Sequence, residues 1–297
     1  MNRFSSTQKF LHIQVDSLGA ELRSLRDGDG AEYLWQRHPA YWARSSPLLF
    51  PWVGRLPNGC YQVNGRSYSL PLHGFAKDSP FVAEQPGPDT LRFHLFDSPA
   101  TLCQFPFAFH LIVTYRLVGQ TLHVDTVVHN TGPVPMLFGL GSHPGFQVPL
   151  TEGLDFSDYD LQFTSVPLLP HRIQFASSGL RTGQSLPFSL GRENRLPLSH
   201  ALFDQEAVVL SQAGNQVSLF PRRGGKGLFL SFPDAPYVGI WQPANTQAPF
   251  LCIEPWCTLP GLEHAPAVWE QDPGLLQLEP GGAFQHRLRI RPFLANG

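Results

Sequence analysis

The stretch LIVTYRLVGQTLHVDTVVH, residues 111–129, alternates apolar and polar side chains on both sides of a Gly-Gln turn. The positions that share one face are Leu111, Val113, Tyr115 and Leu117 before the turn, and Leu122, Val124, Thr126 and Val128 after it. A period of two is typical of a strand with one buried face, because successive side chains of a strand point to opposite sides. The stretch therefore predicts a β-hairpin that packs one face on a core.

The same period recurs near the C-terminus and in several shorter segments. In AFQHRLRIRPF, residues 283–293, apolar side chains fall on one face and arginines on the other, which a helix does not allow. The apolar face holds Phe284, Leu288 and Ile290, and the basic face holds Arg287, Arg289 and Arg291. Further strands are predicted at LHIQV (11–15), AELRSL (20–25), TLRFHLF (90–96), AVVLS (207–211), QVSLF (216–220) and GLFLSF (227–232).

Turn-forming residues separate these segments. The chain holds 29 prolines and 27 glycines, and no window of about 12 residues shows the apolar stripe of an amphipathic helix. Many short strands with such punctuation are typical of an all-β protein, here a large antiparallel β-sandwich. No composition shift or polar linker divides the sequence, so a single domain is predicted over residues 1–297.

The charge of the chain is nearly balanced, with a formal net charge of -2 from 21 basic and 23 acidic residues. Such a chain has no long-range field to recruit nucleic acid or an anionic membrane, so a small and roughly neutral partner is expected. No apolar stretch approaches the roughly 20 residues of a membrane span. Residues 1–16 also lack the apolar core of a signal peptide.

Cysteine usage favours a cytoplasmic protein. The chain has four cysteines without a C-x-x-C pair, and they are Cys60, Cys103, Cys252 and Cys257. Their scatter through a large chain is typical of reduced, buried thiols rather than of a disulfide framework.

Three segments place a titratable side chain in apolar or glycine-rich surroundings. They are residues 47–75 with Arg55 and His73, LFGLGSHPGFQVP (137–149) with His143, and LCIEPWCTLPG (251–261) with Glu254. Two histidines, a glutamate and an arginine are suited to acid/base catalysis on a neutral molecule. Taken singly, each also has a structural explanation, since a histidine beside glycine or proline is commonly a hydrogen-bonded scaffold residue.

The same side chains allow a second chemistry. His73, His143 and Glu254 are the ligand types of hydrolytic zinc enzymes. The usual local signature, two histidines three or four residues apart, is absent here. A zinc hydrolase therefore stays open as a rival without positive support from spacing.

As an ordered set, the motifs resemble the aldose 1-epimerase (galactose mutarotase-like) family, and within it the bacterial LacX-like branch. The matching segments are FPWVGRLPNGCYQVNGRSYSLPLHGFAKD (50–78), GSHPGFQVPL (141–150), GIWQP (239–243) and CIEPWCTLPG (252–261). The resemblance runs from about Leu11 to Phe293. It implies the large antiparallel β-sandwich of that family, a supersandwich, with the site in a cleft on its concave side.

The resemblance also implies a role for each matching residue. Glu254 would be the general base that takes the proton of the anomeric hydroxyl, and His143 the general acid that protonates the ring oxygen. His73 would hold that ring oxygen, Arg55 would bind the sugar, and Trp241 lies on a strand that lines the cleft. The implied protein is an isomerase of carbohydrate metabolism that interconverts the α and β anomers of a free aldose, without cofactor or metal, as a monomer or homodimer.

One segment departs from the family pattern. Where galactose mutarotases carry a sugar-binding aspartate, this chain reads LSHALFDQEAVVL (198–210), which places His200 near that position. His200 is therefore a predicted sugar contact, and a galactose preference does not follow.

Two other functions remain open. PRRGGKG (221–227) lacks the spacing of a phosphate-binding loop and is best explained as a charged hairpin. As a phosphate contact it would instead indicate a hexose-6-phosphate mutarotase, because arginine recognises phosphate well. A carbohydrate-binding protein that kept the cleft but lost turnover is the other alternative.

Overall fold

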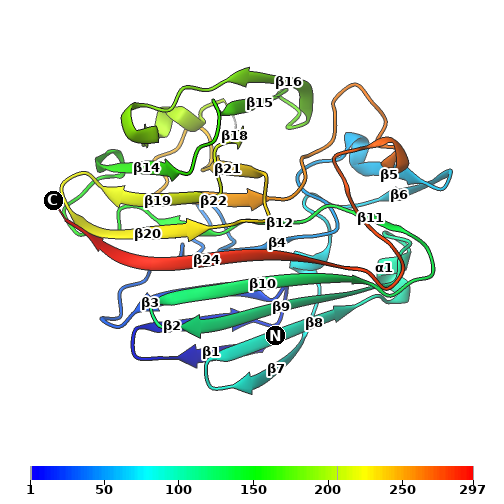
Figure 1. The fold of residues 1–297 in the computed structure, drawn as a ribbon, viewed down its shortest axis with the longest axis horizontal. Coiled ribbons are helices and arrows are strands. Elements are labelled where there is room, and N and C mark those ends of the chain that lie inside the picture. Colours follow the sequence, from blue (N-terminus) through cyan, green and yellow to red (C-terminus); the bar gives the residue numbers. More distant parts are fainter. Residues whose placement is uncertain (1, 206, 297) are drawn as a thin grey trace.

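The computed structural model describes residues 2–205 and 207–296, and most of its regular structure is β-strand (Figure 1). Two large antiparallel sheets dominate. In pairing order, the nine-stranded sheet contains β17 (Arg195–Pro197), β14 (Tyr159–Thr164), β19 (Gln216–Pro221), β20 (Gly225–Ser231), β24 (Ala283–Ala295), β10 (Thr121–Asn130), β9 (Phe109–Val118), β8 (Thr90–Phe96) and β7 (Val82–Gly87). The eight-stranded sheet contains β16 (Arg181–Pro187), β15 (His171–Phe175), β18 (Val208–Ser211), β21 (Tyr237–Trp241), β22 (Phe250–Trp256), β12 (Gly141–Ser142) and β4 (Leu48–Leu49), with β13 (Gly145–Gln147) paired to β22.

Smaller elements complete the fold. They are the three-stranded sheet β1 (Arg3–Thr7), β2 (Leu11–Asp16) and β3 (Glu21–Asp27), and the pairs β5 (Cys60–Val63) with β6 (Arg66–Ser69) and β11 (Met136–Phe138) with β23 (Leu276–Leu278). Helical turns are α1 (Pro99–Leu102), η1 (Pro57–Gly59), η2 (Ala76–Asp78), η3 (Phe156–Asp158), η4 (Arg192–Asn194), η5 (His200–Phe203) and η6 (Trp269–Gln271). Over residues 2–205 and 207–296, no helix has the length and apolar character needed to cross a membrane.

The hairpin predicted from the alternating stretch is formed by β9 and β10. Leu117 pairs with Leu122 beside the turn, and Leu111 pairs with Val128 farther along. β24 then pairs with β10 on one side and with β20 on the other, so the C-terminal strand lies within the sheet. Each segment predicted as a strand overlaps an observed strand, and the prediction of a large antiparallel β-sandwich is confirmed.

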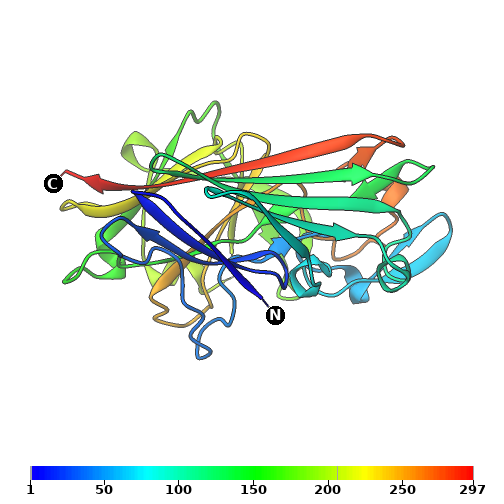
Figure 2. The same ribbon diagram turned by 90° about the horizontal axis from the view of Figure 1, so that it is seen from below.

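Apolar side chains from both large sheets meet in one core. Among them are Leu230 of β20, Ile290 of β24, Ile240 of β21 and Ile253 of β22. Fully burying such a side chain contributes about 1.5–3 kcal/mol, so the two inner faces hold the sandwich together. The N-terminal strands, blue in Figure 2, cover part of the nine-stranded sheet, where β1 contacts β8.

Both faces of β22 are buried, and its side chains alternate between two environments. Leu251 and Ile253 belong to the core between the sheets. Phe250 and Cys252 belong to a separate aromatic cluster on the other face. Because strand side chains alternate, Glu254 falls in this second series. The acid of the IEPW motif therefore points away from the sandwich core, toward the outer face of the eight-stranded sheet.

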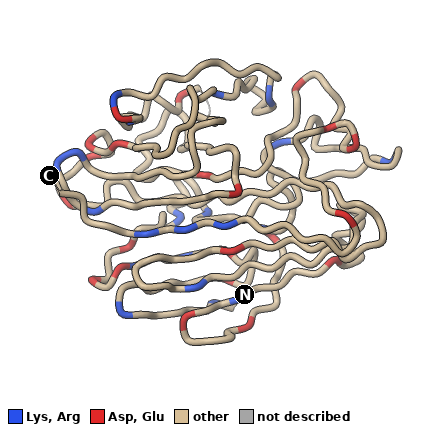
Figure 3. Tube along the Cα trace, in the orientation of Figure 1, with Lys and Arg blue, Asp and Glu red and all other residues tan. Residues whose placement is uncertain are grey.

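Charged side chains of both signs are interspersed along the chain (Figure 3), in keeping with its nearly balanced charge. No disulfide is present in the described residues, and Cys252 and Cys257 are buried as expected. The prediction of buried thiols is wrong for Cys60 and Cys103, which are exposed. Cys60 is the first residue of β5 and lies on its exposed face, and Cys103 follows the surface helix α1.

Candidate active site

A cavity of about 480 Å³ lies over β21 and β22 on the outer face of the eight-stranded sheet. This volume suits a small-molecule ligand. Five of the six residues predicted from the sequence line it, namely Arg55, His73, His143, Trp241 and Glu254. They come from four separate segments of the chain, and the pairing of strands brings them together.

Glu254 lies at the floor of this cavity. Its residue is 2% exposed, on β22 opposite Gly239 of β21. Burial raises the pKa of its carboxyl well above the ordinary value, and Trp256 opposes part of this rise. Within the described residues, Oε2 of Glu254 accepts no hydrogen bond. A buried carboxyl group with an unused acceptor is costly as scaffold, so this geometry suits a group that exchanges a proton with a ligand.

His143 lies where the chain passes from β12 to β13, and both strands pair with β22. Its backbone N–H donates to the carbonyl of Pro47 at 3.2 Å, which fixes the segment against β4. Gly145 makes the close approach to β22 possible. A Cβ at that position would lie 2.9 Å from Cζ3 of Trp42 and 3.2 Å from Sγ of Cys252. The GSHPG motif therefore packs tightly on β22 and leaves His143 only 7% exposed.

The two catalytic candidates are adjacent. Nε2 of His143 lies 3.2 Å from Oε2 of Glu254. Burial lowers the pKa of His143 well below its ordinary value, and the neighbouring His73 acts in the same direction. Burial thus favours the neutral form of both partners, a carboxyl group beside an imidazole. Transfer of one proton from Glu254 to His143 yields a carboxylate and an imidazolium with no change in net charge, so a polar ligand that stabilises both charges favours the transfer.

His73 is held by a reciprocal contact with Gly54. The backbone N–H of Gly54 donates to Nδ1 of His73 at 3.0 Å, and the backbone N–H of His73 donates to the carbonyl of Gly54 at 3.0 Å. Because Nδ1 accepts, the neutral ring carries its proton on Nε2. Burial lowers the pKa of His73 to about 3, with smaller contributions from Lys77 and Arg55. Its ring lies edge-on to that of His143, with centroids 5.4 Å apart. His73 is therefore a neutral hydrogen-bond donor at neutral pH.

Two tryptophans form an aromatic wall. Trp241 was predicted, whereas Trp42 was missed. The ring of Trp42 stacks on His143 at a centroid distance of 4.9 Å and meets Trp241 edge-on at 5.7 Å. Trp42 belongs to the loop segment PAYWARSSP (39–47), where no alternation shows which way a side chain points. The only signal available was a large aromatic residue in a loop, which is weak evidence for a ligand contact.

Basic side chains line another part of the cavity. Arg44, Arg55 and Lys77 all contribute to it. Arg44 and Lys77 both form ion pairs with Asp78, so their charges are partly neutralised. Within the described residues, Arg55 has no carboxylate at ion-pair distance, which leaves its guanidinium free to meet a ligand.

His200 does not line this cavity. Its ring stacks on Phe156 with centroids 4.2 Å apart, and its Nδ1 pairs with Oε1 of Gln242 at 2.9 Å. Gln242 follows Trp241 and points to the other side of the chain. The predicted contact between His200 and a sugar hydroxyl gains no support from this position and stays a prediction.

The basic segment 221–227 joins β19 to β20, as expected for a charged hairpin. Arg222 pairs with Asp160 at 2.6 Å, and Lys226 pairs with Asp27 at 2.5 Å. None of its residues lines the cavity that holds Glu254. This segment therefore gives no support to phosphate recognition at the site.

Glu254 is the single carboxylate among the described residues that line the cavity. The two nearby acids in the sequence are used elsewhere. Asp234 pairs with Arg287 at 2.6 Å, and Glu263 accepts a hydrogen bond from Ser178. A glycosidase normally uses two carboxyl groups that flank the bond, so the lining of this cavity does not fit that chemistry.

One group of side chains at the floor of the cavity and just beneath it has the ligand types of a metal site. A ring nitrogen of His143, Sγ of Cys252 and a carboxylate oxygen of Glu254 lie within 4.8 Å of one another, and all three residues are buried. The rival set predicted from the sequence contained His73 in place of Cys252. His73 is outside this group, and the backbone N–H of Gly54 occupies its Nδ1.

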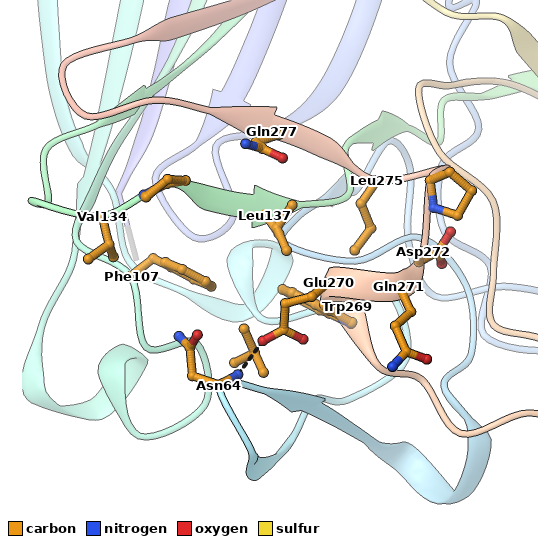
Figure 4. Close-up of a pocket in the computed structure, with 13 residues that line it drawn as sticks. Asn64, Phe107, Val134, Leu137, Trp269, Glu270, Gln271, Asp272, Leu275 and Gln277 are labelled. Atoms are coloured by element: carbon orange, nitrogen blue, oxygen red, sulfur yellow. Dashed lines mark hydrogen bonds between the residues drawn. The ribbon is translucent and has the colours of Figure 1, made fainter.

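A larger cavity of about 720 Å³ lies elsewhere, around Trp269 and Leu137 (Figure 4). Glu270 is directed there toward Asn64 and accepts a hydrogen bond from its backbone N–H. The cavity contains no histidine and none of the predicted site residues. Its acidic side chains have no histidine beside them to form an acid/base pair, so the smaller cavity is the candidate active site.

Comparison with known proteins agrees with this geometry. The family model described as aldose 1-epimerase matches residues 3–291. The chromosomal protein LacX of Lactococcus lactis subsp. lactis is 33% identical over 258 residues, which cover 84% of this chain and 86% of that protein.

Solved structures show the same relationship. A galactose mutarotase-like protein from Lactobacillus casei has a TM-score of 0.93 at 30% identity, covering 98% of this chain and 100% of the other. A galactose mutarotase related enzyme from Lactobacillus acidophilus has a TM-score of 0.92 at 30% identity, covering 98% and 97%. The motif resemblance is thereby confirmed: the chain belongs to the aldose 1-epimerase family.

Proposed function

We propose that the protein is an aldose 1-epimerase, an isomerase that interconverts the α and β anomers of a free aldose. The observation that carries the proposal is the buried pair of His143 and Glu254, 3.2 Å apart in a cavity sized for a monosaccharide. Ring opening requires one proton to reach the ring oxygen while another leaves the anomeric hydroxyl. Two adjacent groups that can exchange a single proton satisfy both requirements.

The catalytic cycle begins when a sugar enters the cavity beside the pair. Its hydroxyls stabilise charge, and Glu254 passes its proton to His143, so that a carboxylate base faces the anomeric hydroxyl and an imidazolium acid faces the ring oxygen. Glu254 then accepts the hydroxyl proton as His143 protonates the ring oxygen, and the bond between C1 and the ring oxygen breaks. Rotation about the bond next to the free aldehyde and reclosure in reverse give the other anomer.

The remaining residues position the sugar. His73 donates from Nε2 toward the ring oxygen, since its Nδ1 is held by Gly54. The C–H face of the sugar packs on the wall formed by Trp42 and Trp241, as aromatic rings favour apolar faces. Arg55 donates to the hydroxyls at the open side.

Substitution of the pair tests the proposal. Glu254→Gln and His143→Asn each remove one proton-transfer group at nearly constant volume, and each is expected to slow exchange about 100 to 10,000-fold. Polarimetry and saturation-transfer NMR on α-glucose and α-galactose measure that exchange. Glu263→Gln, a carboxylate outside the cavity, is the matched control and retains the rate. A Glu254→Gln protein as fast as the wild type refutes the proposed base.

A second function is favoured by one observation, the basic side chains at the cavity. Arg55, Arg44 and Lys77 line the same cavity and would suit the phosphate group of a hexose-6-phosphate. For such a substrate, Arg55→Met raises KM for the sugar phosphate far more than for the free sugar. Equal effects on both substrates favour the free aldose. If the sugar binds but no anomer exchange occurs, the protein is instead a carbohydrate-binding protein.

A further inference from the structure

We propose that His143, Cys252 and Glu254 form a binding site for one zinc ion, and that zinc bound there excludes the sugar. The second part rests on the proposed mutarotase function, whereas the first does not. The metal in this proposal is an inhibitor that competes with substrate. It takes no part in the reaction.

The distances fit a tetrahedral ion after a small contraction. The three ligand atoms lie within 4.8 Å of one another. Bond lengths of about 2.3 Å to sulfur and about 2.0–2.2 Å to nitrogen and oxygen place tetrahedral ligands about 3.5 Å apart. Binding therefore requires the ligand atoms to move together by at most about 1 Å from the upper limit of 4.8 Å.

The backbone holds the ligands on one side of the sheet. Cys252 and Glu254 are two residues apart on β22, so both side chains point to the same face. His143 comes from the β12–β13 connection, which is paired to that strand. Gly145 pairs with Cys252, and a Cβ on Gly145 would crowd its sulfur at 3.2 Å. The absence of that Cβ leaves space around the thiol.

The electrostatics of the site also favour a divalent ion. Glu254 Oε2 is buried without a hydrogen-bond partner in the described part of the chain, and Nε2 of His143 lies 3.2 Å from it. Zinc binding releases the thiol proton and the carboxyl proton to solvent, and the thiolate and carboxylate then neutralise the ion. A combination of sulfur, nitrogen and oxygen ligands suits Zn²⁺ and is unsuited to Mg²⁺ or Ca²⁺, which prefer oxygen.

Zinc and sugar compete for the same atoms. In the proposed cycle, Glu254 must accept a proton from the sugar and His143 must deliver one. The lone pairs of both residues are used when they bind zinc, and both residues line the cavity where the sugar would lie. Zinc inhibition is therefore expected to decrease as the sugar concentration rises.

The binding test uses the full-length protein with the exposed Cys60 and Cys103 replaced by serine. Titration with Co²⁺ is expected to give one ion per chain and a thiolate-to-metal charge-transfer band, and chelator competition gives the affinity for Zn²⁺. Cys252→Ser in this background abolishes the band and weakens zinc binding at least about 10-fold, as loss of a ligand should. Cys257→Ser replaces a buried thiol of the sandwich core, one residue beyond the end of β22, and retains both the band and the affinity.

The activity test adds Zn²⁺ to the mutarotation assay, with each variant normalised to its own metal-free rate. The parent protein, in which only Cys60 and Cys103 are replaced, and its Cys257→Ser variant lose activity with Zn²⁺ and regain it with EDTA. The Cys252→Ser variant is resistant to Zn²⁺. Mg²⁺ does not inhibit any of these proteins. If the parent protein shows no cobalt–thiolate band, the proposed site is wrong. This result needs only the parent, so it holds even if the Cys252→Ser variant does not fold. Zinc binding with the band but without any sugar exchange retains the site and rejects the mutarotase function.

Discussion

We expect the buried imidazole of His286 to lower the stability of the protein in acid, and His286→Gln to remove much of that effect. His286 is 1% exposed on β24, with Nε2 paired to Oγ of Ser142 at 3.1 Å and Nδ1 near Sγ of Cys257 at 3.6 Å. Burial lowers its pKa to about 4, against smaller upward effects of Asp234 and Asp125. Arg289 acts in the same direction as burial.

The sign and magnitude follow from the two pKa values. In the unfolded chain this histidine has a pKa of about 6.5 and is protonated below that pH. In the folded protein its pKa is about 4, so it stays neutral down to about pH 4. Acid therefore stabilises the unfolded state, and the free energy of unfolding falls as the pH drops between these values. A separation of about 2.5 units at 1.36 kcal/mol per unit gives a loss of about 3 kcal/mol between pH 7 and pH 4. His73 adds a loss of the same sign.

Urea unfolding at a series of pH values measures this loss by linear extrapolation. The wild type should lose about 3 kcal/mol more than His286→Gln between pH 7 and pH 4. Glutamine keeps an N–H to pair with Ser142 but cannot titrate. His264→Gln, at a residue whose side chain is 87% exposed, controls for the substitution itself. Parallel pH dependences of wild type and His286→Gln would show that the imidazole is not held neutral by the fold.

Three further substitutions test the site. Trp42→Ala removes the ring stacked on His143 and should raise KM about 10-fold with a smaller change in kcat, as measured by initial-rate polarimetry; an unchanged KM contradicts the aromatic wall. His73→Ala removes the proposed donor to the ring oxygen and should lower kcat about 100-fold; a change confined to KM contradicts that role. Gly74→Ala places a Cβ 2.3 Å from the carbonyl oxygen of Phe50 at a φ of +71°, so urea unfolding should show a loss of more than about 1 kcal/mol, whereas equal stability contradicts the strain.

The period-two pattern made the sheets predictable, because alternation reports directly which side chains face a core. The same alternation also predicts a buried histidine, which was not recognised from the sequence. His286 has the parity of Phe284, Leu288 and Ile290 and is buried with them. Its chain neighbours, Gln285 and Arg287, are both polar and give no sign of this burial. In the fold its ring meets Ser142 and Cys257 in the interior.

Other parts of the site could not be predicted from the sequence. Trp42 lies in a loop, where no period reveals side-chain direction. The proximity of Cys252 to His143 depends on the pairing of β13 with β22, and the spacing of residues along the chain does not reveal that pairing. By contrast, Arg55, His73, His143, Trp241 and Glu254 were located through motif resemblance, and the pairing of distant strands explains why they meet.

The alternation of side chains links the cavity to the interior. On β22 and the residue after it, Glu254 faces the cavity and Cys257 faces the sandwich core. At β12, Ser142 faces the core while the next residue, His143, lines the cavity. His286 contacts both core-facing members, so one buried ring from the opposite sheet joins the two segments that carry the proposed acid and base. Because catalysis is sensitive to small displacements of the reacting groups, we expect the contact that lowers stability in acid also to help hold the spacing of His143 and Glu254.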